Sequence, residues 1–104
     1  MTVPSVGDGQ RIARTVVAEH LAACVNLVPG LRSLFFWEGQ LQEEPEALLV
    51  IKTNRERYEA LQRRVFELHP YSVPEILALP VEAGSPSYLA WVDEAVRTGG
   101  GELP

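Results

Sequence analysis

The chain has 104 residues, of which 46% are hydrophobic and 22% are charged, and this fits one globular domain with a single core. Its formal net charge is −5 at pH 7, which disfavours nucleic acid as a partner because phosphate binding relies on Lys and Arg. Cys24 is the only cysteine, so no internal disulfide can form and a reducing compartment is expected. Neither a membrane span nor a secretory leader is visible. We therefore expect a soluble, cytoplasmic protein.

Hydrophobic periodicity predicts a helix, a long hairpin, a second helix, a strand and a last helix. Residues 1–4 are apolar but fit only the end of a strand. The elements expected after them are a helix at 10–22, strands at 23–28 and 31–37, a polar continuation at 41–46 leading into a strand at 47–51, a helix ending near 69, a strand at 75–81 and a helix from 86. The run at 47–51 is continuously apolar, so we expect both of its faces to be covered.

Local residue types indicate the turns and the helix ends. In chain order these are Asp8 as an N-cap in a loop at 5–9, a bulge at Pro29-Gly30, a turn at Glu38-Gly39-Gln40, a capping box of Thr53 and Glu56, and Ser85-Pro86 at the start of the last helix. Helical spacing places His20 on the solvent side of its helix. The same spacing predicts that the last helix buries Tyr88, Val92 and Val96.

The order of elements predicts an α/β (α+β) fold, the ferredoxin-like βαββαβ sandwich, with an extra C-terminal helix. It forms a single domain at residues 1–98, followed by a flexible tail at 99–104. Two helices cover one face of the sheet and leave the other bare. One small domain cannot bury all of Phe35, Phe36 and Trp37, and an exposed apolar face favours association. We therefore expect an oligomer.

A series of short motifs resembles the CutA proteins, the divalent-cation tolerance family. The motifs are Leu21-Ala22-Ala23-Cys24-Val25-Asn26 with Val28-Pro29-Gly30, Trp37-Glu38-Gly39, Ile51-Lys52-Thr53, His69-Pro70-Tyr71-Ser72-Val73-Pro74-Glu75-Ile76, Leu79-Pro80-Val81 and Tyr88-Leu89-Ala90-Trp91. Each motif is weak alone. Together they run in the family's order through nearly the whole chain, so the resemblance is specific.

The resemblance implies a tight homotrimer, similar to the PII signalling proteins, in which each long hairpin extends onto a neighbouring subunit. It implies a role in tolerance of divalent cations, copper especially, by binding metal ions or signalling in response to them without catalysis. The implied partners are other copies of the chain and divalent metal ions. Two alternatives remain open: a PII-like regulatory trimer that binds a small anion or metabolite at subunit clefts, and a structural trimer with a docking surface.

The chain departs from the family pattern near its start and at one histidine position. The family usually has a full apolar strand before Thr-x-Pro, whereas here only Met1 precedes Thr2-Val3-Pro4. Some members carry a cysteine before that motif and a second histidine before His-Pro-Tyr, and both are assigned to copper in those members. Here the two positions hold Met1 and Leu68, so only His69 of that set remains.

His69 and Cys24 are the candidate metal ligands, through imidazole and thiolate. The alternative for His69 is a histidine at a helix C-terminus that bonds the last carbonyls. The alternative for Cys24 is a buried strand cysteine that acts as a small hydrophobe. One histidine does not make a site, because stable zinc or copper centres use about three or four protein ligands. The acidic cluster of Glu43, Glu44 and Glu46 either holds a hard cation weakly or protects the strand edge.

Glu75 begins an apolar strand and needs a partner if it is buried. Lys52 ends another apolar strand and is the candidate partner. Together with Tyr71 and Trp37, this pair either lines a ligand-binding cleft between subunits or forms an intersubunit salt bridge that fixes the trimer. Trp37 and Trp91 are expected to pack in the core or an interface.

The sequence does not favour an enzyme. It contains no Ser-His-Asp grouping, no glycine-rich phosphate loop and no Cys-x-x-Cys motif. A nucleophile pair of Cys24 and His69 would lack a third residue to orient it.

Overall fold

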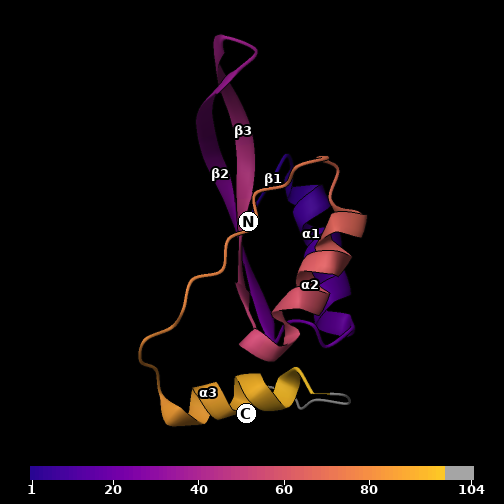
Figure 1. The fold of residues 1–104 in the computed structure, drawn as a ribbon, viewed down its shortest axis with the longest axis vertical. Coiled ribbons are helices and arrows are strands. Elements are labelled where there is room, and N and C mark those ends of the chain that lie inside the picture. Colours follow the sequence, from indigo (N-terminus) through magenta and orange to yellow (C-terminus); the bar gives the residue numbers. More distant parts are fainter. Residues whose placement is uncertain (98–104) are drawn as a thin grey trace.

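The computed structural model describes residues 1–97, which form one antiparallel sheet with two helices on one of its sides and a third helix across its lower end (Figure 1). The strands are β1 (Thr2–Val3), β2 (Cys24–Trp37) and β3 (Gln40–Lys52), in the spatial order β1-β3-β2. The helices are α1 (Val6–Ala18), α2 (Arg55–Leu68) and α3 (Pro86–Ala95). This is the predicted α/β ferredoxin-like architecture with an extra C-terminal helix. The predicted tail at 99–104 lies outside the described residues.

β2 and β3 form one long hairpin that projects beyond the helices (Figure 1). Its turn residues, Glu38 and Gly39, have φ angles of 52° and 77°, and this left-handed pair closes two-residue hairpin loops. The strand pairing shifts between Val28 and Leu31, where Gly30 has a φ of 83°. The predicted turn and the predicted bulge are both confirmed.

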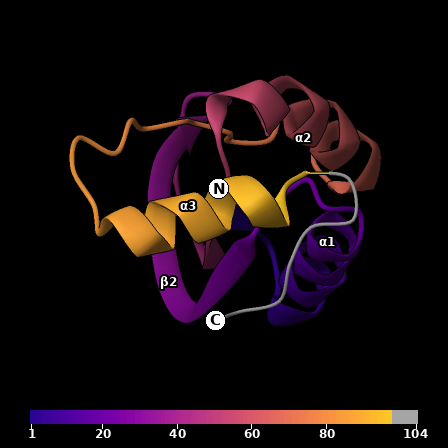
Figure 2. The same ribbon diagram turned by 90° about the horizontal axis from the view of Figure 1, so that it is seen from below.

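The core lies between the lower half of the hairpin and the two helices α1 and α2, which cover the same side of the sheet (Figure 2). Ile12 and Val16 of α1 and Leu49 of β3 are at most 1% exposed. Gly9 lets α1 approach the sheet closely, because a Cβ there would lie 2.8 Å from Leu27 Cδ1. The helix therefore tolerates a residue that usually weakens helices.

The other side of the sheet is bare in the single chain. Ala47 and Leu49 are 1% exposed, whereas Val50, the residue after Leu49 in β3, is 43% exposed. The expectation that 47–51 is covered on both faces is therefore wrong within one chain. Side chains alternate along a strand, and both packed helices lie on one side.

The first two helices begin at residues other than those predicted. α1 begins at Val6, because the Ser5 hydroxyl, not Asp8, caps it and accepts from the Asp8 N–H at 3.1 Å. The N-cap of α2 is Asn54, whose Oδ1 accepts from the Arg57 N–H at 3.1 Å. The Thr53 hydroxyl instead donates to the Leu21 carbonyl at 2.8 Å. The predicted capping box is therefore wrong by one residue.

The predicted strand at 75–81 is absent from the single chain. Residues 74–85, here called the arm, form neither helix nor strand and run outside the body to α3 (Figure 1). Leu77, Leu79 and Val81 are 76%, 85% and 73% exposed. A strand needs a neighbour for its hydrogen bonds, and the two residues of β1 provide too short an edge.

α3 lies across the lower end of the hairpin (Figure 2). Val92, Ala95 and Val96 are buried, but Tyr88 is 39% exposed, so its predicted burial is wrong. The His20 Nδ1 lies 3.2 Å from the Ala95 carbonyl oxygen. The predicted solvent position of His20 is also wrong, because α3 folds back over the end of α1. Within residues 1–97, no helix is long and apolar enough to cross a membrane.

Candidate functional site

The side chain of His69 is fixed by two hydrogen bonds at the end of α2. It is 8% exposed. Its Nε2 lies 2.8 Å from the Thr2 carbonyl oxygen, and its Nδ1 accepts from the Tyr71 N–H at 3.0 Å. A carbonyl only accepts, so Nε2 carries the proton and Nδ1 presents its lone pair. Metal binding at His69 would require one of these bonds to break.

The expected contact between His69 and the last carbonyls of α2 is wrong, because the ring bonds to β1 instead. The Leu68 carbonyl at that helix end accepts from Arg11 Nη2 at 2.8 Å. Sequence analysis missed this role of Arg11, because a bond between residues far apart in the chain depends on how α1 and α2 pack.

Tyr71 joins the His69 corner to β3. Its hydroxyl donates to Glu46 Oε2 at 2.9 Å, and its ring lies 4.9 Å from the His69 ring, centroid to centroid. Burial, followed by the hydrogen bond to the Glu46 carboxylate, raises the pKa of Tyr71 to about 12. The phenol is therefore a neutral donor across the ordinary pH range.

Glu75 and Lys52 do not pair within one chain. Glu75 Oε2 lies 3.7 Å from the Met1 ammonium nitrogen. The Lys52 ammonium group instead donates to Asn26 Oδ1 and lies 3.8 Å from Cys24 Sγ. The pair is not formed inside the subunit, since Lys52 lies at the open end of the hairpin and Glu75 lies near β1. The expected contact between subunits stays a prediction.

The four cleft candidates therefore occupy separate places. Trp37 sits beside the hairpin turn, is 62% exposed and pairs with Gln40. Lys52 lies at the far end of β3, about 40 Å from that turn at roughly 3.3 Å per residue. Tyr71 and Glu75 lie between these extremes, close to β1. A cleft that combines residues from neighbouring subunits stays a prediction.

No set of metal ligands is assembled within the described part of one chain. Residues 1–97 contain no group of three or more His, Cys, Asp or Glu side chains placed to hold an ion. Cys24 is a free, partly exposed thiol at the Lys52 end of the hairpin, away from the His69 corner. In the acidic cluster, Glu43 pairs with Arg32 at 3.1 Å and Glu46 accepts from Tyr71. The residues present do not fit a preformed copper centre in one subunit.

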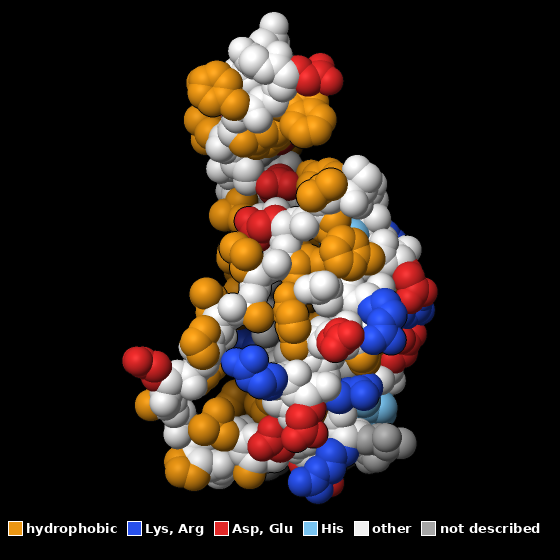
Figure 3. Space-filling model, in the orientation of Figure 1, with side chains coloured by type: hydrophobic (Ala, Val, Ile, Leu, Met, Phe, Trp, Pro, Cys, Tyr) orange, Lys and Arg blue, Asp and Glu red, His pale blue; other side chains and the backbone are white. Residues whose placement is uncertain are grey.

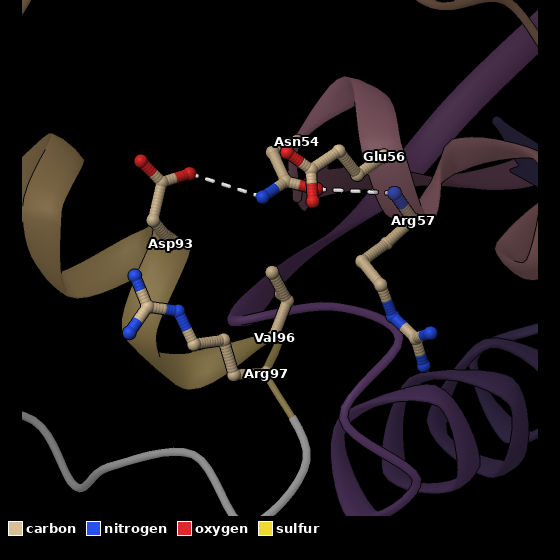
Figure 4. A pocket seen from close by; sticks show the side chains of 6 residues that line it. All are labelled: Asn54, Glu56, Arg57, Asp93, Val96 and Arg97. Atoms are coloured by element: carbon tan, nitrogen blue, oxygen red, sulfur yellow. Dashed lines mark hydrogen bonds between the residues drawn. The ribbon is translucent and has the colours of Figure 1, made fainter.

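An open pocket of about 540 Å³ lies between the start of α2 and the end of α3 (Figure 4). Its lining residues are Asn54, Glu56, Arg57, Asp93, Val96 and Arg97. Asn54 Nδ2 donates to Asp93 Oδ1 at 3.0 Å, which ties the two helices together. The Nε of Arg57 is buried without a hydrogen-bond partner in residues 1–97. The lining holds two arginines and two carboxylates, so its charge favours no class of ligand.

Comparison with known proteins gives one family over nearly the whole chain. Residues 1–95 match the family model described as CutA1 divalent ion tolerance protein. The divalent-cation tolerance protein CutA of Thermus thermophilus is 49% identical over 94 residues, which cover 90% of this chain and 91% of that protein. A solved structure of the Thermus thermophilus protein superposes with a TM-score of 0.88 at the same identity and coverage.

Plant and archaeal proteins show the same similarity. The chloroplastic protein CutA 1 of Oryza sativa is 44% identical over 97 residues, which cover 93% of this chain but only 55% of that protein. The solved structure of CutA1 from Oryza sativa has a TM-score of 0.90 at 45% identity, covering 92% of this chain and 88% of that one. A periplasmic divalent cation tolerance protein from Archaeoglobus fulgidus has a TM-score of 0.89 at 38% identity and covers 92% and 93%. This chain belongs to the CutA family of divalent-cation tolerance proteins.

Proposed function

We propose that this chain is the subunit of a PII-like homotrimer that supports tolerance to divalent cations, copper among them, without catalysing a covalent reaction. The observation that carries this proposal is the apolar surface that the chain leaves open on the hairpin end and the arm (Figure 3). Phe36, Trp37 and Leu41 near the turn are 74%, 62% and 63% exposed. Surfaces of this kind mark protein contacts in folded proteins.

The strand edges support an assembly of several copies. β2 is an outer strand in the order β1-β3-β2, so the backbone groups on its free edge can pair with another chain. The arm is extended and carries apolar residues at the alternate positions Leu77, Leu79 and Val81. If the arm pairs with a neighbour's β2, it gains the strand partner that it lacks in one chain.

Metal binding in this proposal is completed between subunits. Cys24 has a free, partly exposed thiol, and thiolates are ligands that copper and zinc prefer. Both ring nitrogens of His69 are already hydrogen bonded. We therefore favour Cys24 over His69 as the side chain that contacts the ion, with its remaining ligands from other copies or from solvent.

Calorimetric titration with Cu²⁺ and with Zn²⁺ tests direct binding. The wild type should give a saturable heat that Cys24→Ser removes. His69→Gln serves as a matched control, because it changes the other candidate ligand and should retain the heat. Heats that never saturate in the wild type would count against direct binding, and loss of the heat only in His69→Gln would reverse the assignment.

A second candidate function, binding of a small anion, is favoured by Lys52. Its side chain is partly buried, and among the described residues no carboxylate lies within ion-pair distance of its ammonium group. A partly buried cation without a counter-ion favours an anionic ligand. A thermal-shift screen of nucleotides and organic acids should then show stabilisation that Lys52→Met abolishes. Stabilisation by metal alone would remove this candidate.

The compartment is also a proposal. The single cysteine favours a reducing cytoplasm, whereas relatives carry names that place them in the chloroplast and the periplasm. Fractionation of the source cells with an antibody against this chain distinguishes these compartments.

A further inference from the structure

We propose that the arm is the cleavage site at which an endopeptidase cuts chains that have not assembled. The protease binds the arm as an extended strand, and water hydrolyses the bond between Leu77 and Ala78. Cleavage of the single chain follows from the structure of one subunit. Protection of the arm by assembly rests on the proposed trimer.

The backbone of the arm is open to a second protein over a long stretch. Residues 77–85 are all exposed, and residues 74–85 belong to no helix or strand (Figure 1). Within residues 1–97, the backbone groups of 75–84 form no hydrogen bond to other backbone groups. Proteolytic nicking concentrates in exposed connections, and an extended segment with free backbone groups can be bound by strand addition. The arm therefore has the backbone that a protease requires.

The side chains of the arm suit an endopeptidase that accepts aliphatic residues. Leu77, Leu79 and Val81 are 76%, 85% and 73% exposed (Figure 3). The bond after Leu79 leads into Pro80, whose ring nitrogen carries no N–H and whose φ angle is fixed, and this makes it a poor substrate bond. Ala78 follows Leu77 and imposes no such restriction. This difference selects the bond between Leu77 and Ala78.

The hairpin end provides an internal contrast, because its side chains are equally apolar but its backbone is paired. Phe36 and Trp37 are 74% and 62% exposed. Their register partners in β3 are Leu41 and Gln40. A protease can bind this segment as an extended strand only after the two strands separate locally, and that opening costs free energy. Exposed apolar side chains are thus common to both regions, whereas the unpaired backbone is specific to the arm.

Hydrolysis in the arm separates α3 from the body of the chain. The carbon–nitrogen bond breaks, and one water molecule leaves a carboxylate on Leu77 and an ammonium group on Ala78. α3 has 10 residues, and isolated helices of that length are marginal in water. The hydrogen bond from Asn54 Nδ2 to Asp93 Oδ1, which ties α3 to α2, is exposed to solvent. The cut therefore weakens the attachment of α3.

Limited digestion with chymotrypsin, which cuts after leucine and after aromatic residues, tests the site on single chains. Wild-type protein is diluted from denaturant to a low concentration, and short protease pulses are applied while light scattering follows the mass. Phe36→Ser, with a weakened hairpin end, provides a second source of single chains. Fragment 1–77, identified by mass spectrometry, should be the first product. A first cut at the hairpin end or elsewhere before residue 75, or single chains that resist digestion, would overturn the proposal.

Two variants assign the cleavage to its bond. Ala78→Pro places an imide after Leu77, so fragment 1–77 should be lost and the intact single chain should survive longer than the wild type. Ala83→Pro makes the same substitution in the same arm beyond the proposed bond, and should retain the wild-type rate and product. Loss of intact Ala78→Pro chain at the wild-type rate would show that the arm is not the main route of cleavage.

Digestion of the assembled protein tests protection by neighbouring copies. At concentrations where the mass is near three times 11.5 kDa, fragment 1–77 should form more slowly than from single chains. Equal rates from assembled and single chains would contradict protection by assembly. A mass near 11.5 kDa at every concentration, with fragment 1–77 still the first product, would support the cleavage site and contradict the trimer.

Discussion

The packed body of this molecule buries its large apolar side chains, whereas the two projecting parts, the arm and the hairpin end, leave theirs exposed. In the body, Val3, Ile12 and Val16 are completely buried. In the arm and the hairpin end, Phe36, Leu79 and other large apolar side chains are mostly exposed. The sequence supplies apolar residues to both regions, but only the body has α1 and α2 to cover them.

The two regions therefore have different sources of stability. The body is closed within one chain, so its contacts do not depend on protein concentration. The projecting parts become stable only when another molecule covers them, and their contribution rises with concentration by mass action. Mutations in the two regions should therefore be distinguishable by how their effects respond to dilution.

The largest expected effect comes from a cavity in the body. Leu49→Ala removes a side chain that is 1% exposed and should lower the unfolding free energy by about 2–5 kcal/mol at every protein concentration. Denaturant unfolding at several concentrations measures it. Leu79→Ala makes the same change at an 85% exposed arm position, so any loss there should be largest at high concentration and should shrink on dilution as the assembly dissociates. Equal, concentration-independent losses in the two variants would break the distinction between the regions.

Assembly should be disturbed next most strongly at the hairpin end. Phe36→Ser removes an aromatic ring that is 74% exposed near the turn, and Phe66→Ser changes a 50% exposed ring on α2 as the matched control. Light scattering should show a lower average mass for Phe36→Ser on dilution and the wild-type mass for Phe66→Ser. A fall in mass only for the Phe66 variant would place the contact surface on the helices instead.

A smaller effect, on how stability depends on pH, is expected at Tyr71. Its pKa, raised from 10.0 to about 12, means that the folded state favours the neutral phenol. This preference stabilises the fold fully at pH values below the tyrosine pKa of the unfolded chain. The stabilisation is lost as the pH rises through the pKa of Tyr71 in the folded chain. Ultraviolet absorbance of phenolate, compared with Tyr71→Phe, measures this titration. Glu46→Gln should move the titration only partway back, because burial, the largest single cause of the raised pKa, remains. An unchanged titration would contradict the Glu46 contact.

The smallest effect concerns the exposed pair that joins the end of α1 to α2. Arg64 Nη2 and Glu19 Oε2 lie 2.9 Å apart, and the hydrogen bond to Arg64 lowers the pKa of Glu19. A carboxyl group with a lowered pKa stabilises the fold at pH values above its pKa in the unfolded chain. This stabilisation is lost as the pH falls through its pKa in the folded chain. Glu19→Gln should lower the melting temperature slightly at neutral pH and less in high salt, since solvent screens exposed pairs. A large loss that persists in salt would be inconsistent with this.

Sequence reasoning predicted the features that local chemistry sets. The hairpin turn at Glu38-Gly39 and the bulge at Pro29-Gly30 depend on residues with left-handed φ angles, so the sequence itself indicates them. It missed the contacts of His20 with Ala95 and of Arg11 with Leu68, because those depend on how the helices pack. It also predicted a strand at 75–81, where the residues have the right alternation but the β1 edge of the single chain is too short for pairing.

The arrangement of the candidate residues could be predicted only where they are close in the sequence. His69 and Tyr71 stand close in sequence and do lie together, with a ring separation of 4.9 Å. Lys52 and Glu75 were predicted as partners from their charges, yet within one chain Lys52 lies at the open end of the hairpin. Glu75 lies beside β1, 3.7 Å from the Met1 ammonium nitrogen. Charge complementarity alone does not fix a partner when several opposite charges are available.

The most direct test of the central claim is the solution mass of the wild-type protein, measured by light scattering coupled to gel filtration. If the arm and the hairpin end are covered by other copies, the mass should be near three times the 11.5 kDa of one chain. A mass near 11.5 kDa at every concentration would show that these apolar surfaces remain uncovered, and would contradict the proposed trimer.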